Sequence, residues 1–509
     1  MSENPLAAWR DSVLRGEKRG MEFHHKFPRA ASRWGMVQLL AGHPAPSRVL
    51  FLGATLGGDI RGAVRLGHEV VVADPSPEAL ASLSSETDGL SIPNESLVRT
   101  TPSALLDLGA PFDIVWVTPW WLANCRPERV ALTRLLENAK ECMAPEGRLL
   151  LQILSRRPSA LTRYIARAVS GQPFPFKLFR KLPYWKEGAL RETMVRCGLE
   201  GSQTFYVADG LTTHTTIINA SLSPRQIARS RFGSVPGFGT RFRQAPLRIL
   251  SALGGSPGRG FPFQIVSAGR NGERGTVVPD LLRRLLHARV TGRVVTALFA
   301  GDGGPWFVRV DTGCGSALRE ARLLEFLSER EEVAAFVHAP DRIQKVAGLE
   351  AAWYRYLPGY SFQGTGAGTH REQIEEFLRR LSSVPPPAFL EPAGDRLGRY
   401  LGRRREKAPE RVKRALDSLE RLSRDGAFRW ITHGELRDGN IHVVREPEGL
   451  KVVDWVQSYR GHPLLDWWMY NYWNGAPEGP GHSPEQLRMG LTDHAVSDLW
   501  SVWRASYDR

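Results

Sequence analysis

A regular alternation of apolar runs and helical stretches between residues 47 and 222 most constrains what this chain can fold into. The run "RVLFLGA" precedes "GDIRGAVRLG", "EVVVADP" precedes "SPEALASLSS", and "FDIVWVTP" precedes "RPERVALTRLLENAKECM". Short strands that alternate with helices build a parallel sheet with helices on both faces. The block ends with a helical stretch and two further strand-like runs, "SQTFYVA" and "TTIINASL". We therefore expect an α/β, Rossmann-like domain over residues 25–223.

The ends of the first two strands carry candidate binding residues. The first strand leads into a glycine-bearing turn, "GATLGG", and the second ends in Asp74. Such a turn lets the backbone approach a ligand, and an acidic strand end can accept hydrogen bonds from ribose hydroxyls. With "FDIVWV" and "CMAPEGRLLL" as its fourth and fifth strands, the segment 45–222 resembles class I S-adenosylmethionine-dependent methyltransferases. The resemblance implies a parallel sheet with an antiparallel end, and S-adenosylmethionine held by Gly53, Gly57 and Asp74.

Two departures from that family leave the cofactor open. Phe51 occupies the usual acidic position of the first strand, and Thr55 replaces the middle glycine of the turn. The alternative is a degenerate Rossmann-like domain that only docks a substrate or a partner. A nicotinamide cofactor is disfavoured, because "GATLGG" departs from G-x-G-x-x-G. Trp120 and Trp121, after the fourth strand, line a substrate pocket or belong to the core.

The remainder of the chain predicts a linker followed by a second domain. We expect residues 1–24 to form an N-terminal arm and the Gly, Pro and Arg-rich residues 224–275 to form a linker. From residue 276 a new pattern begins, with strands "RVVTALFAG" and "PWFVRVD", a helix "ALREARLLEFLSE", and then a mainly helical segment beyond 370. We expect the second domain to span 276–509, with lobes 276–360 and 361–509.

The segment "ITHGELRDGNIHVV", together with "LKVVDWVQ", has the residues that phosphoryl transfer requires. That reaction needs a carboxylate to orient or accept the hydroxyl proton, and side chains that hold magnesium against the phosphates. Glu435 is the candidate base, Asn440 the amide ligand and Asp454 the metal-holding carboxylate. The spacing from Glu435 to Asn440 matches the H-R-D-x-x-x-x-N loop of protein kinases. Alternatively, Asn440 and Asp454 are ordinary turn residues, which is a common role for asparagine and aspartate.

The same segment resembles the aminoglycoside phosphotransferase and choline kinase-like family. The family loop reads H-G-D-x-x-x-x-N followed by I-D-W or I-D-F, where this chain has "HGELRDGN" and "VVDW". The resemblance, over about 280–470, implies an α+β bilobal protein-kinase-like fold and a nucleotide bound with Mg²⁺. It also implies that Arg309 holds the phosphates, that Glu320 pairs with Arg309, and that Asp466 supports the loop. The family gives His433 a structural role only.

Charge and composition limit the choice of partners. The formal net charge of +15 favours anionic ligands, but no motif that reads RNA or DNA accompanies it, so we expect no nucleic-acid partner. The scattered cysteines predict reduced thiols rather than a disulfide or zinc framework. No apolar run is long enough to span a bilayer and the N-terminus has no apolar signal segment, so we expect a cytoplasmic protein.

Together these features predict a phosphotransferase that moves a nucleotide γ-phosphate to a hydroxyl of a small molecule or glycan, coupled or not to methylation. ATP and GTP remain alternatives, because no Gly-rich cover loop precedes Arg309. Glu435 extends one methylene further than the family aspartate, and a positioning error of ~1 Å can cost on the order of 10²-fold in rate. The competing hypotheses are a methyltransferase whose kinase-like half senses a nucleotide, and a binding scaffold with a pseudokinase domain.

Overall fold

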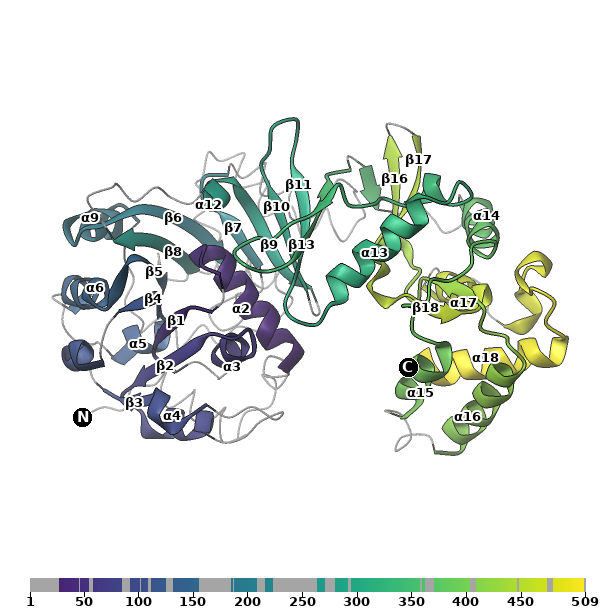
Figure 1. The fold of residues 1–509 in the computed structure, drawn as a ribbon, viewed down its shortest axis with the longest axis horizontal. Coiled ribbons are helices and arrows are strands. Elements are labelled where there is room, and N and C mark those ends of the chain that lie inside the picture. The colour runs from purple at the N-terminus through teal and green to yellow at the C-terminus, as the bar shows by residue number, and fades with distance from the viewer. Residues whose placement is uncertain are drawn as a thin grey trace, which may run out of the picture. The chain divides into compact units, whose positions relative to one another are not determined.

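The computed structural model resolves the chain into two compact units, each described here by itself (Figure 1). The first contains the elements from α2 to β11 together with β12 and β13, and the second contains α13 from Leu318 onward, η5, and all elements from β14. The described residues are 27–44, 46–54, 58–84, 92–100, 102–108, 111–124, 131–154, 185, 187–207, 216–222, 263–270, 280–291, 294–357, 359–361, 370–402, 409–445, 448–473 and 479–507. The expected arm, 1–24, lies outside them.

Five parallel strands, in the order β3-β2-β1-β4-β5, confirm the predicted Rossmann-like sheet. Neighbouring residues of a strand point to opposite faces, and Leu50 and Phe51 of β1 accordingly enter two different hydrophobic clusters. Both faces of the sheet are therefore covered. The strands are β1 (Arg48–Leu52), β2 (Glu69–Asp74), β3 (Leu97–Arg99), β4 (Phe112–Val117) and β5 (Met143–Leu154), and the helices of this part are α2 (Phe27–Ala41), α3 (Gly58–Arg65), α4 (Pro77–Ser84), α5 (Pro119–Asn124), α6 (Ala131–Glu141) and α9 (Glu187–Arg196).

The linker predicted over residues 224–275 is wrong for its C-terminal part. Residues 263–270 form β8 (Phe263–Arg270), which lies between β5 and β6 (Leu199–Val207) and pairs antiparallel with both. Its sequence "FQIVSAGR" can be buried in a sheet, but its hydrogen-bond partners are more than 50 residues away along the chain. Residues 224–262 and 271–275 of the expected linker lie outside the described residues.

The boundary predicted at residue 276 does not separate two sheets. β7 (Thr216–Asn219) pairs antiparallel with β9 (Leu285–Thr291), so the Rossmann-like strands and the strands of the expected kinase N-lobe form one sheet of 13 described strands. The order continues from β9 through β10, β11 and β13 to β12. These elements are α12 (Asp280–Arg284), β10 (Val294–Phe299), β11 (Trp306–Asp311), β12 (Arg342–Ile343) and β13 (Ala351–Arg355).

Helix α2 packs against both parts of this sheet. Residues 33–41 of α2 are all buried, which identifies an internal helix. On one side Trp34 packs on Phe51, with 5.2 Å between ring centroids, and on the other Gln38 donates a 2.8 Å hydrogen bond to the Ala347 carbonyl. A Cβ atom on Gly35 would lie 2.6 Å from Thr312 Cγ2. The helix therefore approaches the strand end at Thr312 as closely as a glycine allows.

We expect Gly35→Ala to destabilise the protein by about 1–3 kcal/mol, the usual cost of overpacking a core, despite the better helix propensity of alanine. The matched control is Gly398→Ala in α15 (Ala393–Gly402), where a new Cβ would meet nothing within 4 Å. There the same change should stabilise by up to about 1 kcal/mol. Thermal unfolding of the two variants should therefore shift in opposite directions. A rise in melting temperature for both would contradict the close packing of α2.

The second unit is mainly helical, as predicted, with two small sheets. β14, β16 and β17 form one sheet, in which β16 and β17 are the expected hairpin, and β15 pairs with β18. Its helices bury a cluster of tryptophans that includes Trp467, Trp468 and Trp503. The elements are α13 (Ser316–Ser328), η5 (Ala334–Phe336), β14 (Gly359–Ser361), α14 (Arg371–Leu381), α16 (Pro409–Arg424), β15 (Trp430–Thr432), η6 (Asp438–Asn440), β16 (Ile441–Arg445), β17 (Glu448–Val452), η7 (Trp455–Gln457), β18 (Tyr459–Gly461), α17 (Pro463–Trp473) and α18 (Asp493–Tyr507).

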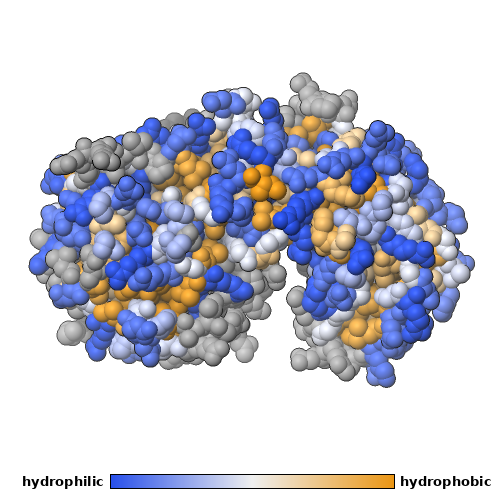
Figure 2. All heavy atoms as spheres, in the orientation of Figure 1, coloured by the Kyte–Doolittle hydropathy of each residue, from blue (hydrophilic) through white to orange (hydrophobic). Residues whose placement is uncertain are grey.

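The surface is mostly polar on the face drawn in Figure 2, where apolar residues show as separate patches. Within the described part of the chain, no helix combines the length and the apolar composition needed to cross a bilayer. Trp473, at the end of α17, is among the few large apolar side chains that are exposed in the described residues.

Candidate active site

The predicted catalytic loop connects β15 to β16 in the second unit and is fixed by Asp466, in the first turn of α17. The Asp466 carboxylate accepts hydrogen bonds from the backbone N–H of His433, at 2.6 Å, and of Gly434, at 2.8 Å. Gly434 has a φ of +82°, and a Cβ there would lie 2.4 Å from the Gln457 carbonyl oxygen. The predicted support of the loop by Asp466 is thus confirmed.

His433 connects the loop to the segment that carries Asp454. Its Nδ1 accepts a hydrogen bond from the Glu435 backbone N–H at 3.3 Å, and its Nε2 lies 2.9 Å from the Val453 carbonyl oxygen, to which it donates. Acceptance at Nδ1 requires a neutral ring, and burial lowers the pKa of His433 to about 4. The histidine therefore has the structural role that the sequence predicted.

Asn440 and Asp454 are held by neighbouring backbone. The Asn440 carbonyl accepts a 2.9 Å hydrogen bond from the Val453 N–H, next to Asp454, and the Asn440 side-chain amide donates at 2.9 Å to the Glu435 carbonyl. Because the amide nitrogen makes this contact, the oxygen of the Asn440 side chain is not used in it and can serve as an acceptor or a metal ligand. Asp454 has a left-handed backbone, with φ 67° and ψ 53°, a conformation that is uncommon outside glycine, asparagine and aspartate. Strain of this kind is concentrated at functional sites.

Glu435, the predicted base, forms an ion pair with a residue that the sequence analysis did not select. Arg437 Nη2 lies 2.9 Å from Glu435 Oε1, and the Arg437 guanidinium carbon lies 5.6 Å from the centre of the Trp473 ring. Burial raises the pKa of Glu435, Arg437 lowers it, and Asp454 adds a smaller upward contribution. The position of Arg437, two residues after Glu435 on a tight loop, was the available signal for this pair.

Glu320, on α13, holds the backbone directly after Asp454. Its Oε1 accepts a 2.8 Å hydrogen bond from the Trp455 N–H, and both residues are buried. The sequence predicted that Glu320 pairs with Arg309. Arg309 lies on β11 in the first unit, and its side chain is buried. Glu320 belongs to the second unit, so the pairing of the two residues stays a prediction.

The start of α13 is fixed by Asp311 at the end of β11. Its Oδ1 accepts hydrogen bonds of 2.9–3.0 Å from the N–H groups of Gly313, Cys314 and Gly315, and its Oδ2 accepts one of 2.9 Å from Ala317. A carboxylate that accepts several backbone N–H groups at a helix start satisfies donors that have no partner within the helix. The sequence "DTGCGSA" therefore specifies where the helix that carries Glu320 begins.

In the first unit, Asp74 and Gly53, which were predicted to bind S-adenosylmethionine, make contacts within the fold. Asp74 has no exposed surface, and its oxygens accept backbone hydrogen bonds from Ala54, at 2.7 Å, and Ser76, at 2.8 Å. Gly53 has a φ of +89°, and a Cβ there would lie 2.6 Å from the Trp121 backbone nitrogen, so no room exists on that side. Trp121 is buried, which makes it a core residue, whereas Gly57 and the Trp120 side chain lie outside the described residues.

The two predicted cofactors therefore differ in how well the described residues fit them. The Asp454 carboxylate, on a strained turn, and the Asn440 amide oxygen fit Mg²⁺, which is usually bound by one or two protein groups together with substrate phosphates. The described residues contain no group of three or more His, Cys, Asp or Glu that could hold a metal ion. In contrast, both oxygens of Asp74 already accept backbone hydrogen bonds, from Ala54 and Ser76, and binding of S-adenosylmethionine stays a prediction.

Comparisons with known proteins give one family match and several similar solved structures. The model of the phosphotransferase enzyme family matches residues 294–503. Among solved structures, a macrolide 2'-phosphotransferase type I is 18% identical, with a TM-score of 0.29, over 42% of this chain and 80% of that chain. A TehB-like S-adenosylmethionine-dependent methyltransferase from Corynebacterium glutamicum is 14% identical, with a TM-score of 0.28, over 53% and 97% of the two chains. A methyltransferase from Archaeoglobus fulgidus is 12% identical, with a TM-score of 0.29, over 48% and 92%.

No curated protein sequence matches the chain. The family match begins at β10 and ends within α18, so it includes the catalytic loop, Asp454 and Asp466. The strand order β3-β2-β1-β4-β5, followed by the antiparallel strand β8 and then β6, is that of a methyltransferase-like Rossmann fold. The chain therefore combines a kinase-like domain of the phosphotransferase enzyme family, at residues 294–503, with an N-terminal methyltransferase-like Rossmann fold.

Proposed function

We propose that this protein transfers the γ-phosphate of ATP or GTP to a hydroxyl group of a small molecule or glycan. The observation that supports this most is the set of hydrogen bonds that connects the predicted site residues within the second unit. His433 bonds both the Glu435 N–H and the Val453 carbonyl, and Asn440 bonds both the Glu435 carbonyl and the Val453 N–H. These hydrogen bonds fix the loop that carries Glu435 relative to the turn that carries Asp454. Phosphoryl transfer needs such fixed positions of the base and the metal ligands.

Each residue of the frame has a distinct role in the proposed reaction. Glu435, in its ionised form, orients the acceptor hydroxyl and accepts its proton as the oxygen attacks the γ-phosphorus, while the bond to the β,γ-bridging oxygen breaks and the nucleoside diphosphate leaves. Asn440 and Asp454 would hold magnesium, which neutralises charge on the phosphates when it is bound. Glu320 keeps Asp454 in place through the Trp455 N–H, at 2.8 Å. In the first unit, Arg309 is proposed to contact the nucleotide phosphates.

One observation favours a second function, nucleotide sensing without turnover. Glu435 is longer than the family aspartate and is engaged by Arg437 at 2.9 Å, so an acceptor hydroxyl must compete with a cation for it. A Mg²⁺-dependent rise in melting temperature with ATP or GTP tests binding, and nucleotide turnover over a panel of hydroxyl compounds tests transfer. Binding with turnover supports the kinase. Binding without turnover over the whole panel would leave the sensor as the function of this site.

The ion pair also predicts the pH dependence of turnover. The pKa of Glu435 is raised above its ordinary value, so the ionised base is lost as the pH falls through this raised pKa. Because Arg437 lowers this pKa, Arg437→Met should raise it further and move the acidic limb of the kcat profile to higher pH. The control is Arg424→Met, an exposed arginine on α16 that pairs with Glu420. An unchanged limb in Arg437→Met would show that Glu435 is not the titrating base.

A further inference from the structure

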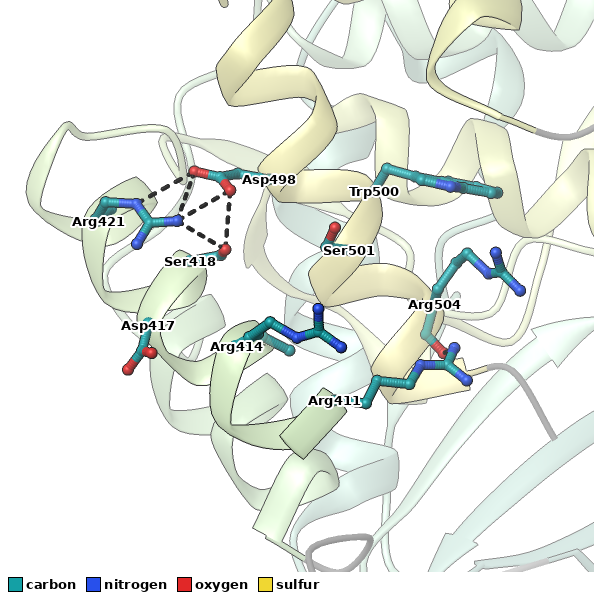
Figure 3. Close-up of a pocket in the computed structure, with 10 residues that line it drawn as sticks. Arg411, Arg414, Asp417, Ser418, Arg421, Asp498, Trp500, Ser501 and Arg504 are labelled. Atoms are coloured by element: carbon teal, nitrogen blue, oxygen red, sulfur yellow. Dashed lines mark hydrogen bonds and ion pairs between the residues drawn. The ribbon is translucent and has the colours of Figure 1, made fainter. Parts of the chain in front are cut away.

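A pocket of ≈ 610 Å³ lies between α16 and α18 in the second unit, apart from the residues of the candidate active site (Figure 3). None of its lining residues belongs to the catalytic loop or to the segment around Asp454. A volume of this size is typical of pockets that bind small molecules. The lining residues are Arg411, Arg414, Ala415, Asp417, Ser418 and Arg421 from α16, and Asp498, Trp500, Ser501 and Arg504 from α18.

One end of the pocket is neutralised by contacts within the protein. Arg421 Nη2 lies 3.0 Å from Asp498 Oδ1 and 3.0 Å from Oδ2, and Ser418 donates a 2.9 Å hydrogen bond to the same carboxylate. Figure 3 shows these three side chains bonded to one another at one edge of the pocket. This pair consumes one arginine and one aspartate of the lining. The remaining charged lining residues are three arginines and a single aspartate.

The three arginines give the other end a positive character. Arg411 and Arg414 are one turn apart on α16, and Arg411 reaches α18 by donating a 2.7 Å hydrogen bond to the Arg504 carbonyl. Figure 3 shows the guanidinium groups of Arg411, Arg414 and Arg504 on the same side of the pocket, with Asp417 directed away from them. Like charges one helical turn apart repel one another, and an anion that bridges the guanidinium groups removes the repulsion.

Trp500 forms a rigid aromatic wall beside the arginines. Its ring stacks on Trp503, with 4.9 Å between centroids and 11° between planes, and contacts Trp468 edge to face at 5.0 Å. Trp503 and Trp468 are buried, so the orientation of the Trp500 ring is fixed by the core of the unit. A fixed aromatic surface next to several guanidinium groups suits a ligand that has both a ring and an anionic group.

We propose that this pocket binds a compact organic phosphate, with the phosphate on Arg411, Arg414 and Arg504 and a sugar or other ring beside Trp500. A polymer is disfavoured because acidic side chains flank the basic lining among the described residues of the two helices. Glu410 and Glu420 on α16, and Asp493 at the start of α18, are exposed and would face an extended polyanion. The site goes beyond the proposed phosphoryl transfer and does not depend on it.

Calorimetry of the full chain with glucose 6-phosphate, glucose and inorganic phosphate tests the proposal. We expect glucose 6-phosphate to bind more tightly than either of the others. Its Kd should rise about tenfold or more when Arg414 and Arg504 are both replaced by alanine, because charged hydrogen bonds are lost. The Kd should be unchanged in Arg424→Ala, whose arginine lies on the same helix and outside the pocket lining. It should also be unchanged in Asp454→Asn, which separates this site from the nucleotide site.

A second variant keeps the test valid if the double replacement disturbs the fold. Ser501→Glu places a negative charge in the pocket at an exposed position of α18. It should raise the Kd of glucose 6-phosphate to a similar extent. The proposal is overturned if no phosphate compound binds, if binding survives in both pocket variants, or if inorganic phosphate binds as tightly as glucose 6-phosphate. Tighter binding of a 20-nucleotide single-stranded DNA, lost in the same variants, would instead identify a polyanion surface and also overturn it.

Discussion

Asp454→Asn is expected to lower the rate of phosphoryl transfer by roughly 10³-fold. A loss of this size is typical when a charge that stabilises the transferred phosphoryl group is removed. The side chain keeps its size, and asparagine tolerates the left-handed backbone that residue 454 adopts, with φ 67°. The change therefore removes a negative charge without adding backbone strain. Steady-state turnover and the Mg²⁺-dependent shift in melting temperature with ATP or GTP should both be lost, while the melting temperature of the free protein stays unchanged.

The control for this variant is Asp425→Asn, an exposed aspartate that follows α16. It makes the same chemical change and should leave both turnover and nucleotide stabilisation as they are. If Asp454→Asn retained full turnover, Asp454 would not be a metal-holding group. If it lost stability without nucleotide, its role would be to shape the turn, and the loss of activity would follow from unfolding.

Asp466→Ala is expected to produce the largest loss of stability, about 2–5 kcal/mol, because it leaves two buried backbone N–H groups without an acceptor. These are the His433 and Gly434 amides, which donate to Asp466 at 2.6 and 2.8 Å. Native-state hydrogen exchange should show both amides exchanging faster, together with others of the catalytic loop. Asp466→Asn keeps one acceptor and should give an intermediate effect. Slow exchange of both amides in Asp466→Ala would contradict the supporting role of this carboxylate.

The same residue makes stability depend on pH. Burial raises the pKa of Asp466 from 3.8 to about 7, opposed by the hydrogen bonds from Gly434 and His433. A carboxyl group whose pKa is raised by folding binds its proton more readily in the folded state, so its contribution is full below the unfolded pKa and is lost as the pH rises towards 7. The slope of stability against pH between these values should be flatter in Asp466→Asn than in the wild type.

The features that sequence analysis predicted are those encoded over short stretches of chain. The apolar runs before Gly53 and Asp74 predicted parallel strands, and the spacing of Glu435, Asn440 and Asp454 predicted a loop followed by a hairpin. The support from Asp466 followed from a family resemblance, because nothing local connects a helix start to a loop more than 25 residues earlier. Periodicity and loop spacing specify local conformation, and these predictions needed little else.

The features that were missed depend on pairing between distant segments. β8 lies in a stretch whose neighbours are rich in Gly, Pro and Arg, and its place between β5 and β6 is set by partners elsewhere in the chain. The pairing of β7 with β9, which joins the strands of both predicted domains in one sheet, likewise depends on segments far apart in the chain. Asp74 was expected to accept hydrogen bonds from a ribose, and those that it accepts from the Ala54 and Ser76 amides were not predicted. A carboxylate at a strand end can serve either purpose, and the sequence does not distinguish a ligand from a turn.

Transfer of radiolabelled γ-phosphate is the most direct test of the proposed reaction. Wild type, Glu435→Asp and Asp454→Asn would be incubated with labelled ATP or GTP, Mg²⁺ and a panel of hydroxyl acceptors, and the labelled products separated from nucleotide. Label should appear on an acceptor with wild type, appear faster with Glu435→Asp, and be absent with Asp454→Asn. Nucleotide binding without label on any acceptor, in both wild type and Glu435→Asp, would contradict phosphoryl transfer at this site.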